Sequence, residues 1–185
     1  MANLNENSKP DNSSITETQK KFAWLAYGKQ MSYADIAATL NVSRADLTTW
    51  DNPKENKALD EYKKRIATIK KLHTTKEIKC DFEEFYNWFQ TKEKDKKCLY
   101  CGITEPELEK LFNIESEKGL LLTKRKRGKK LELDRKVPDA KYTDLNNIVY
   151  ACYWCNNAKT DTFTEEEFLK VGEIIGQIWK KRLGK

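Results

Sequence analysis

The sequence predicts an α+β protein that is mainly helical and built in two folded parts. Most of the 185 residues place apolar side chains at helical spacing, whereas only two short stretches have the period of a strand. Two Cys-x-x-Cys pairs in the second half indicate a small metal-stabilised domain there. We therefore expect a helical domain over 15–58, a linker helix over 59–78 and a zinc-stabilised domain over 79–185. Residues 1–14 are polar and are expected to form a disordered tail.

Three helices are predicted in the first part of the chain. The first covers residues 15–28 and has Thr16 as its N-cap. The second begins at Ser32 or the residue after it and ends at Asn41, since asparagine tolerates the left-handed conformation of a tight turn. Ser43 then caps the third helix. Small Ala37 is expected to let the second and third helices approach, and the shared core is predicted to contain Ile36, Leu40, Val42, Leu47 and Trp50.

This arrangement resembles the helix-turn-helix heads of phage small terminases and transposase-like proteins. The outward residues of the third helix are Arg44, Ala45, Asp46, Thr48 and Thr49. The resemblance implies that this helix lies in the major groove of DNA, with Arg44, Thr48 and Thr49 as contacts. Asp46 could accept a hydrogen bond from cytosine or could cap the helix. A helical hairpin that packs on a partner protein is the alternative, because only one arginine is available.

Further helices are predicted in the second part. Residues 81–91 carry five large aromatic or apolar positions, which favour a core helix over a base-stacking surface. A short helix covers 105–113. The last helix covers 164–183, begins with a capping box of Thr164 and Glu167, and is expected to pack on the helix at 81–91. Its apolar side is predicted to consist of Phe168, Val171, Ile174, Ile175, Ile178 and Trp179.

The cysteines form two pairs with the spacing of zinc knuckles, Cys98 with Cys101 and Cys152 with Cys155. Structural disulfides or free thiols are the alternative, but no secretory signal precedes them, which favours metal binding. Four thiolates complete a tetrahedral site, so we expect one structural zinc ion. Cys80 is left over and is predicted to be a small buried side chain.

Residues 131–161 predict a strand, a loop, a second strand and a helix. The first strand alternates apolar and acidic residues and ends at Asp134, and the second runs from Asn147 to Tyr150. The helix opens at Cys152. Carboxylate and amide oxygens suit Mg²⁺, which keeps several waters and takes few protein ligands.

These motifs together resemble the HNH endonuclease family, which has the ββα-metal fold. The matching residues are Asp134-Arg135, Asn147, Cys152-x-x-Cys155-Asn156 and Lys159. The resemblance covers residues 92–170. It implies DNA cleavage with Mg²⁺ or Mn²⁺ on Asp134 and Asn156, a loop braced by Asn147, and a phosphate held by Lys159. In this scheme Glu132 either provides a further carboxylate ligand or supports one of the ligands without touching the ion.

Arg135 stands where the family has the histidine that activates water. Arginine stays protonated and cannot act as an ordinary base, so we expect it to bind phosphate. Tyr142, Lys136 and Glu132 are the nearby candidates for a base. The only histidine, His73, lies far from the motif in sequence.

A run of cations precedes the first strand, with six basic residues in seven positions at 124–130. Such a run is often a solvated loop, but here a docked phosphate backbone would pass close by. The predicted DNA contacts in this run are Lys124, Arg125, Lys126 and Arg127.

The composition is consistent with a polyanionic partner, since the net charge is +6 and the pI is about 8.9. No apolar run is long enough to span a bilayer, so we expect a cytoplasmic protein with no membrane partner. The predicted partner is DNA, and a partner protein of a phage or defence system is a further expectation. A DNA-binding or assembly factor that has lost cleavage is the alternative function, and no stretch resembles a dedicated RNA-binding module.

Overall fold

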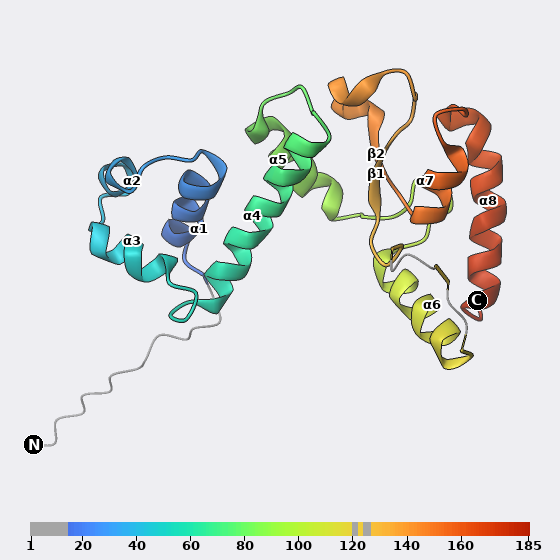
Figure 1. Cartoon of the computed structure of the whole chain (residues 1–185), viewed down its shortest axis with the longest axis horizontal. Coiled ribbons are helices and arrows are strands. Elements are labelled where there is room, and N and C mark those ends of the chain that lie inside the picture. The colour runs from blue at the N-terminus through green and yellow to red at the C-terminus, as the bar shows by residue number, and fades with distance from the viewer. Residues whose placement is uncertain (1–14, 120–121, 124–126) are drawn as a thin grey trace, which may run out of the picture. The chain divides into compact units, whose positions relative to one another are not determined.

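The computed structural model describes residues 15–119, 122–123 and 127–185. In this part of the chain, helices predominate and a single two-stranded antiparallel sheet is present, which confirms the predicted α+β, mainly helical class. Figure 1 shows the order of these elements along the chain.

Two compact units make up the fold, Met1–Thr75 and Lys76–Lys185. Several predicted features lie outside the described residues. They are the tail at 1–14 and three of the predicted DNA contacts, Lys124, Arg125 and Lys126.

The first unit is helical. Its elements are α1 (Glu17–Ala23), the π-helical turn η1 (Trp24–Gly28), α2 (Tyr33–Leu40), α3 (Arg44–Asp51) and α4 (Lys57–Thr75). The core is formed by apolar side chains from all four α-helices, among them Phe22, Ile36, Leu47, Leu59 and Ile66. The helix that was predicted as a linker over 59–78 is therefore part of this unit, because α4 buries its apolar face against α1 and η1.

The turn between α2 and α3 has the predicted geometry. Asn41 adopts the left-handed conformation, with φ of 51° and ψ of 50°. Ser43 caps α3, and Asp46 completes the capping box by accepting hydrogen bonds from the backbone and hydroxyl of Ser43. Asp46 therefore caps the helix, which is one of the two roles predicted for it.

A partly buried polar cluster joins α3 to α4. The Asp51 carboxylate accepts hydrogen bonds from the Tyr27 hydroxyl at 2.5 Å and from Lys63 Nζ at 2.9 Å. Partial burial acts to raise the pKa of Asp51, but these hydrogen bonds outweigh it and lower the pKa. The C-terminal end of α3 is thereby fixed to α4.

The second unit contains the sheet. Its elements are α5 (Phe82–Glu93), α6 (Glu105–Glu117), β1 (Glu132–Arg135), the 3₁₀ turns η2 (Lys141–Thr143) and η3 (Leu145–Asn147), β2 (Ile148–Ala151), α7 (Tyr153–Lys159) and α8 (Glu165–Arg182). In the antiparallel register Glu132 lies opposite Ala151 and Arg135 opposite Ile148. The predicted order of strand, loop, strand and helix is confirmed.

The two faces of the hairpin are covered by different helices. Because side chains alternate along a strand, Glu132 and Asp134 share the face that α7 covers. Tyr150 points to the other face, where its ring lies 6.0 Å from that of Phe89 in α5. The aromatic helix is therefore a core helix, as predicted.

The position predicted for α8 is wrong. This helix packs against α7, where Trp179 meets Trp154 at a ring distance of 5.0 Å, and against the loop that holds Cys98 and Cys101. In Figure 1, α5 and α8 lie on opposite sides of the hairpin. Three apolar residues predicted to face inward are exposed, namely Val171, Ile174 and Ile178.

Two glycines allow α8 to approach the cysteine loop closely. A Cβ at Gly172 would lie 2.6 Å from the carbonyl oxygen of Tyr100, and one at Gly176 would lie 2.7 Å from that of Cys101. Both contacts are with backbone, which cannot move aside as the end of a flexible side chain can.

We expect Gly172→Ala to destabilise the second unit by about 1–3 kcal/mol, because the added methyl group overpacks this contact. The sign of this stability change is informative. Helix propensity alone favours alanine over glycine by roughly 0.8–1.0 kcal/mol, so a loss of stability points to the steric contact. Urea denaturation followed by circular dichroism measures the change, with Glu173→Ala on the exposed side of α8 as the control. A Gly172→Ala protein more stable than wild type would contradict the close approach.

No helix within the described residues is both long enough and apolar enough to cross a membrane.

Candidate metal centre and polar site

Four cysteine thiols meet in the second unit. Cys98 and Cys101 come from the loop before α6, Cys152 is the N-cap of α7, and Cys155 lies in its first turn. Their sulfur atoms all lie within 4.8 Å of one another. The predicted cluster is therefore confirmed, and it can hold a metal ion such as zinc.

The geometry and chemistry of the cluster fit zinc. The sulfurs of Cys101 and Cys152 are 3.7 Å apart, and a tetrahedral site with Zn–S bonds of about 2.3 Å places its sulfurs about 3.8 Å apart. Three of the four residues are buried and Cys101 is half-buried. Four protein ligands leave no position for a water molecule, so such an ion would be structural.

The thiols influence one another strongly. Hydrogen bonds from Cys101, Cys152 and Cys155 lower the pKa of Cys98, whereas hydrogen bonding with Cys101 raises the pKa of Cys152 and of Cys155. One buried thiolate is thus favoured at the expense of the others. A bound cation removes this conflict, because metal ligation deprotonates a coordinating thiol.

The cysteine loop is also tied to the hairpin by backbone hydrogen bonds. Leu99 donates its N–H to the carbonyl of Tyr150 at 2.8 Å, and Cys98 donates to the carbonyl of Ile103 at 2.9 Å. Cys80 lies outside the cluster and is half-buried rather than buried, and burial raises the pKa of its thiol.

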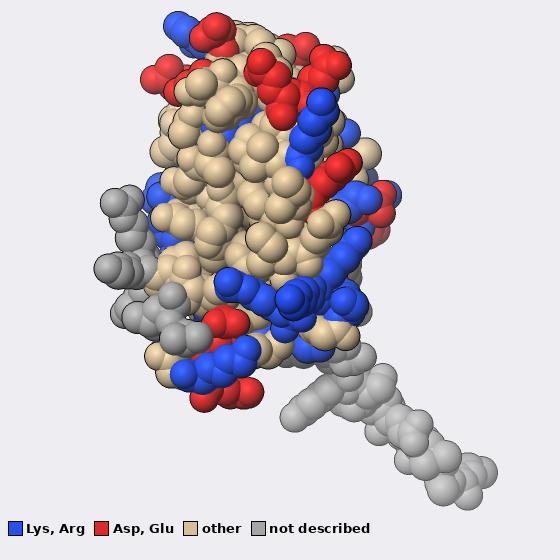
Figure 2. Space-filling view, turned by 90° about the vertical axis from the view of Figure 1, so that its right-hand side faces the viewer, with Lys and Arg blue, Asp and Glu red and all other residues tan. Residues whose placement is uncertain are grey.

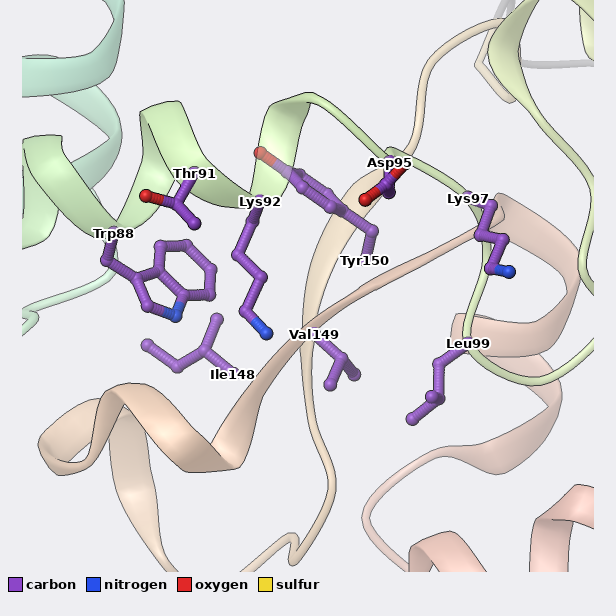
Figure 3. Close-up of a pocket in the computed structure, with 9 residues that line it drawn as sticks. All are labelled: Trp88, Thr91, Lys92, Asp95, Lys97, Leu99, Ile148, Val149 and Tyr150. Carbon is purple, nitrogen blue, oxygen red and sulfur yellow. The ribbon is translucent and has the colours of Figure 1, made fainter.

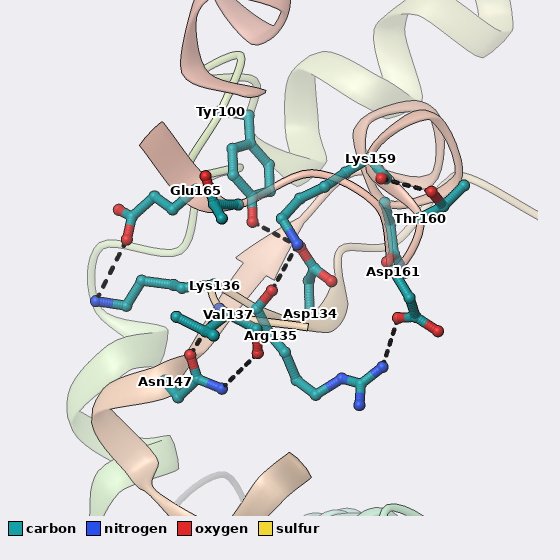
Figure 4. A network of polar contacts seen from close by, with 12 residues as sticks. Tyr100, Asp134, Arg135, Lys136, Val137, Asn147, Lys159, Thr160, Asp161 and Glu165 are labelled. Carbon is teal, nitrogen blue, oxygen red and sulfur yellow. Dashed lines mark hydrogen bonds and ion pairs between the residues drawn. The ribbon is translucent and has the colours of Figure 1, made fainter. Parts of the chain in front are cut away.

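A second group of polar side chains surrounds Asp134 on the face of β1 covered by α7 (Figure 4). The Tyr100 hydroxyl donates a hydrogen bond of 2.6 Å to Oδ2 of Asp134, and Lys159 Nζ lies 3.7 Å from the same oxygen. Asp134 is 7% exposed. Burial, and then the bond to Asp134, raise the pKa of Tyr100, so the tyrosine stays a donor.

Lys159 does not fit the phosphate role predicted for it. The residue is 0% exposed, and its ammonium group donates a hydrogen bond of 2.7 Å to the carbonyl oxygen of Arg135. A charged group so deeply buried needs a partner, which Asp134 supplies. Lys159 therefore links α7 to the end of β1.

Asn147 braces the loop between the strands, as predicted. Its Oδ1 accepts from the N–H of Val137 at 2.8 Å, while Nδ2 donates to the carbonyls of Val137 and Ala140 at 3.1 Å each. The side chain thereby supplies hydrogen-bond partners to backbone groups of the loop that have no partner in the sheet. Both ends of the hairpin loop are thereby held.

Asn156 faces β1 from α7. Its Nδ2 donates a hydrogen bond of 2.9 Å to Oε2 of Glu132, and Glu132 also pairs with Arg127 at 2.7 Å. Glu132 therefore holds the Asn156 side chain in place. Because its nitrogen is the donor, Asn156 keeps its amide oxygen as an acceptor or ligand atom.

Arg135 lies at the end of β1, partly open to solvent with 24% of its side chain exposed. Its guanidinium pairs with Asp161 at 2.6 Å and lies over the ring of Tyr142, 5.4 Å from the ring centre. These two contacts hold a fixed positive charge next to Asp134 in sequence.

The residues considered as a general base all have partners. Lys136 pairs with Glu165 at 3.7 Å. The Tyr142 hydroxyl accepts from Lys76 at 3.1 Å and contacts the carbonyl of Leu133 at 3.3 Å. His73 lies in the last turn of α4, in the first unit.

A groove of about 360 Å³ runs beside β2 (Figure 3). Its wall combines apolar residues with two exposed lysines, Lys92 and Lys97, and one exposed acid, Asp95. The larger side chains that line it are Trp88, Leu99, Ile148, Val149 and Tyr150. Sequence reasoning missed this groove, because its wall is drawn from α5, the cysteine loop and β2, which are far apart in the chain.

The predicted DNA contacts of the first unit are exposed on α3, namely Arg44, Thr48 and Thr49. Both threonine hydroxyls bond carbonyls of their own helix, Thr48 that of Arg44 and Thr49 that of Ala45. In the second unit Arg127 is tied to Glu132 and lies over the ring of Tyr153.

The described residues thus contain a tetracysteine cluster and, beside it, a polar site around Asp134 and Asn156. The cysteines are the one group of three or more histidine, cysteine or acidic residues in this part of the chain that could hold a metal ion. Comparison with known proteins adds no family, since no family model, curated protein or solved structure matches the chain.

Proposed function

We propose that the protein is a DNA endonuclease that hydrolyses phosphodiester bonds with a divalent metal on an HNH-like ββα element. The observation that carries this proposal is the placement of Asp134 and Asn156 on facing elements. One offers a carboxylate from β1 and the other an amide oxygen from α7. The helix-turn-helix of the first unit would deliver the site to its DNA.

The donor atoms suit Mg²⁺ or Mn²⁺ in type. Tyr100 and Lys159 both contact Oδ2 of Asp134. These two contacts leave Oδ1 as the oxygen that could bind an ion. Glu132 fixes the Asn156 side chain so that its oxygen remains a ligand atom. A divalent ion held there would supply Lewis-acid stabilisation of the phosphodiester.

Arg135 is the residue that we expect to bind the phosphate next to the scissile bond. A guanidinium pairs with phosphate through two parallel hydrogen bonds and remains charged at any working pH. Asp161 and Tyr142 limit the positions that the side chain can take. It would offset the negative charge that builds up during attack.

The groove beside β2 is a suitable path for one DNA strand. Lys92 and Lys97 would meet the phosphates of that strand. Val149 lines this groove and pairs with Asp134 in the hairpin, so the groove borders the strand next to β1.

A DNA-binding factor that does not cleave is the second candidate function. It is favoured by Lys159, whose ammonium group lies 3.7 Å from Asp134 and neutralises the carboxylate that an ion would need. Arg135 in the position of the family's base favours the same alternative. Both candidates predict DNA binding and differ in hydrolysis.

Cleavage of supercoiled plasmid with Mg²⁺ or Mn²⁺ tests the proposal. We expect wild type to cut, and Asp134→Asn and Asn156→Ala to lower the rate by about 10²–10³-fold, as loss of a transition-state contact does. Glu173→Gln, which removes an exposed carboxylate from α8, is the matched control and should cut normally. DNA affinity is measured in parallel by fluorescence anisotropy with a labelled duplex.

Two outcomes decide between the candidates. Wild type that binds the duplex but cuts with neither ion would identify the non-cleaving factor. Asp134→Asn cutting as fast as wild type would show that the hydrolysis does not depend on this site.

A further inference from the structure

Helix α8 presents an apolar stripe to solvent. Val171, Ile174 and Ile178 are 45%, 59% and 45% exposed. Their spacing of three and four residues aligns them on one side of the helix, while Phe168 and Trp179 face the core. Single exposed apolar residues are ordinary, but an aligned set marks an interaction surface.

Opposite charges stand at the two ends of this stripe. The first turn of α8 is acidic (Glu165, Glu166 and Glu167), and the last turn is basic (Lys180, Lys181 and Arg182). Figure 2 shows this face, with an uncharged area between a mainly acidic end and a mainly basic end.

Glu167 and Arg182 lie at the two ends of the stripe. Lys170, four residues before Ile174, and Lys181, three residues after Ile178, border it along its length. Glu167 is four residues before Val171, and Arg182 is four residues after Ile178, so both lie on the same side of the helix as the stripe. Glu167 accepts from Thr164 through Oε2, and a carboxylate has further lone pairs for a second donor. The Arg182 guanidinium lies over the Trp179 ring, 5.3 Å from its centre, at the edge of the exposed face.

We propose that this stripe binds α8 of a second copy of the chain, with the two helices antiparallel. Val171 of one copy would then pack on Ile178 of the other, and Ile174 on Ile175. The same alignment sets Glu167 of each copy opposite Arg182 of the other. The surface is thus complementary to itself in charge as well as in shape.

The antiparallel orientation follows from the charges. A parallel pair would bring the two acidic turns together and the two basic turns together, and like charges on neighbouring helices repel. The opposed helix dipoles add to the preference.

The association is weak and depends on concentration. A helix of 18 residues is about 27 Å long, and one pair of such helices buries less than the roughly 1,200–2,000 Å² of a standard interface. We expect a dissociation constant in the micromolar range. The inference does not depend on the proposed hydrolysis, because it concerns a face on the far side of α8 from the cysteine loop.

Sedimentation equilibrium of the full chain over micromolar to submillimolar concentrations tests the dimer. The mass of wild type should rise from 21.7 kDa towards twice that value. Ile174→Glu should remain monomeric, because it buries a charge in the stripe. Gln177→Glu introduces the same charge on the same helix beside the stripe and should still dimerise. Wild type that stays monomeric, or Ile174→Glu that dimerises normally, would overturn the proposal.

A pair of charge reversals tests the orientation. In the antiparallel dimer Arg182→Glu places like charges opposite each other, and we expect it to raise the dissociation constant about tenfold. Lys180→Glu has the same change of charge on another side of α8 and should leave the constant unchanged. In a parallel dimer residue 182 of one copy faces residue 182 of the other, so Arg182→Glu exchanges one like-charge pair for another and does not weaken association. An unchanged or lower dissociation constant for this variant would therefore overturn the orientation.

Discussion

Cys155→Ser is expected to unfold the second unit and to abolish stoichiometric zinc binding. Three remaining thiolates leave the tetrahedral site incomplete, and the elements that the cluster joins lose their shared ligand. Structural zinc contributes about 10–16 kcal/mol of apparent binding free energy in zinc-finger peptides, which bounds the effect from above. Because the apolar contacts of α5, α6 and α8 remain in the variant, we expect the free energy of unfolding to fall by less than this bound, by several kcal/mol.

Elemental analysis and thermal denaturation followed by circular dichroism measure the two effects. A chelator should destabilise wild type in the same way, and acid should do so as well, because the thiols must be deprotonated to bind the metal. Cys80→Ser is the control and should keep one zinc per chain, since Cys80 lies outside the cluster. A Cys155→Ser protein that keeps both its zinc and its stability would contradict the assignment.

Lys159→Met is expected to destabilise the second unit by about 3–5 kcal/mol, as loss of one member of a buried ion pair does. Methionine has nearly the same length as lysine, so packing is preserved while the charge and the hydrogen bond to the Arg135 carbonyl are lost. Asp134 then stays buried with the Tyr100 hydroxyl as its remaining partner among these contacts.

A double-mutant cycle isolates the charge from the packing. Asp134→Asn removes the buried carboxylate, so the Asp134→Asn, Lys159→Met protein should be more stable than the sum of the two single changes predicts. Urea denaturation without added Mg²⁺ gives the four free energies of unfolding. Simple additivity would show that Lys159 and Asp134 are not coupled, despite their separation of 3.7 Å.

Local signals predicted most of the elements correctly. Asn41 and Ser43 fix the turn between α2 and α3 through their own backbone preferences, which require no knowledge of the rest of the fold. The cysteine spacing predicted the cluster because few alternatives satisfy four thiols together. The bracing role of Asn147 came from a family resemblance, and its hydrogen bonds confirm it.

Contacts between distant segments could not be predicted in this way. Helix α8 has apolar residues on two sides, and periodicity alone does not say which side is buried. Gly172 and Gly176 mark the buried side of α8, because the absence of a Cβ at these positions lets the cysteine loop pack closely against the helix. The phosphate role of Lys159 came from the family resemblance, whereas its burial depends on pairing with a carboxylate 25 residues earlier.

The position of Tyr100 connects the two polar centres of the second unit. In the sequence it stands between Cys98 and Cys101 of the cluster, and its hydroxyl donates a hydrogen bond to the Asp134 carboxylate. The conformation of the cysteine loop therefore bears directly on the Asp134 carboxylate, because a residue of that loop supplies its hydrogen-bond donor.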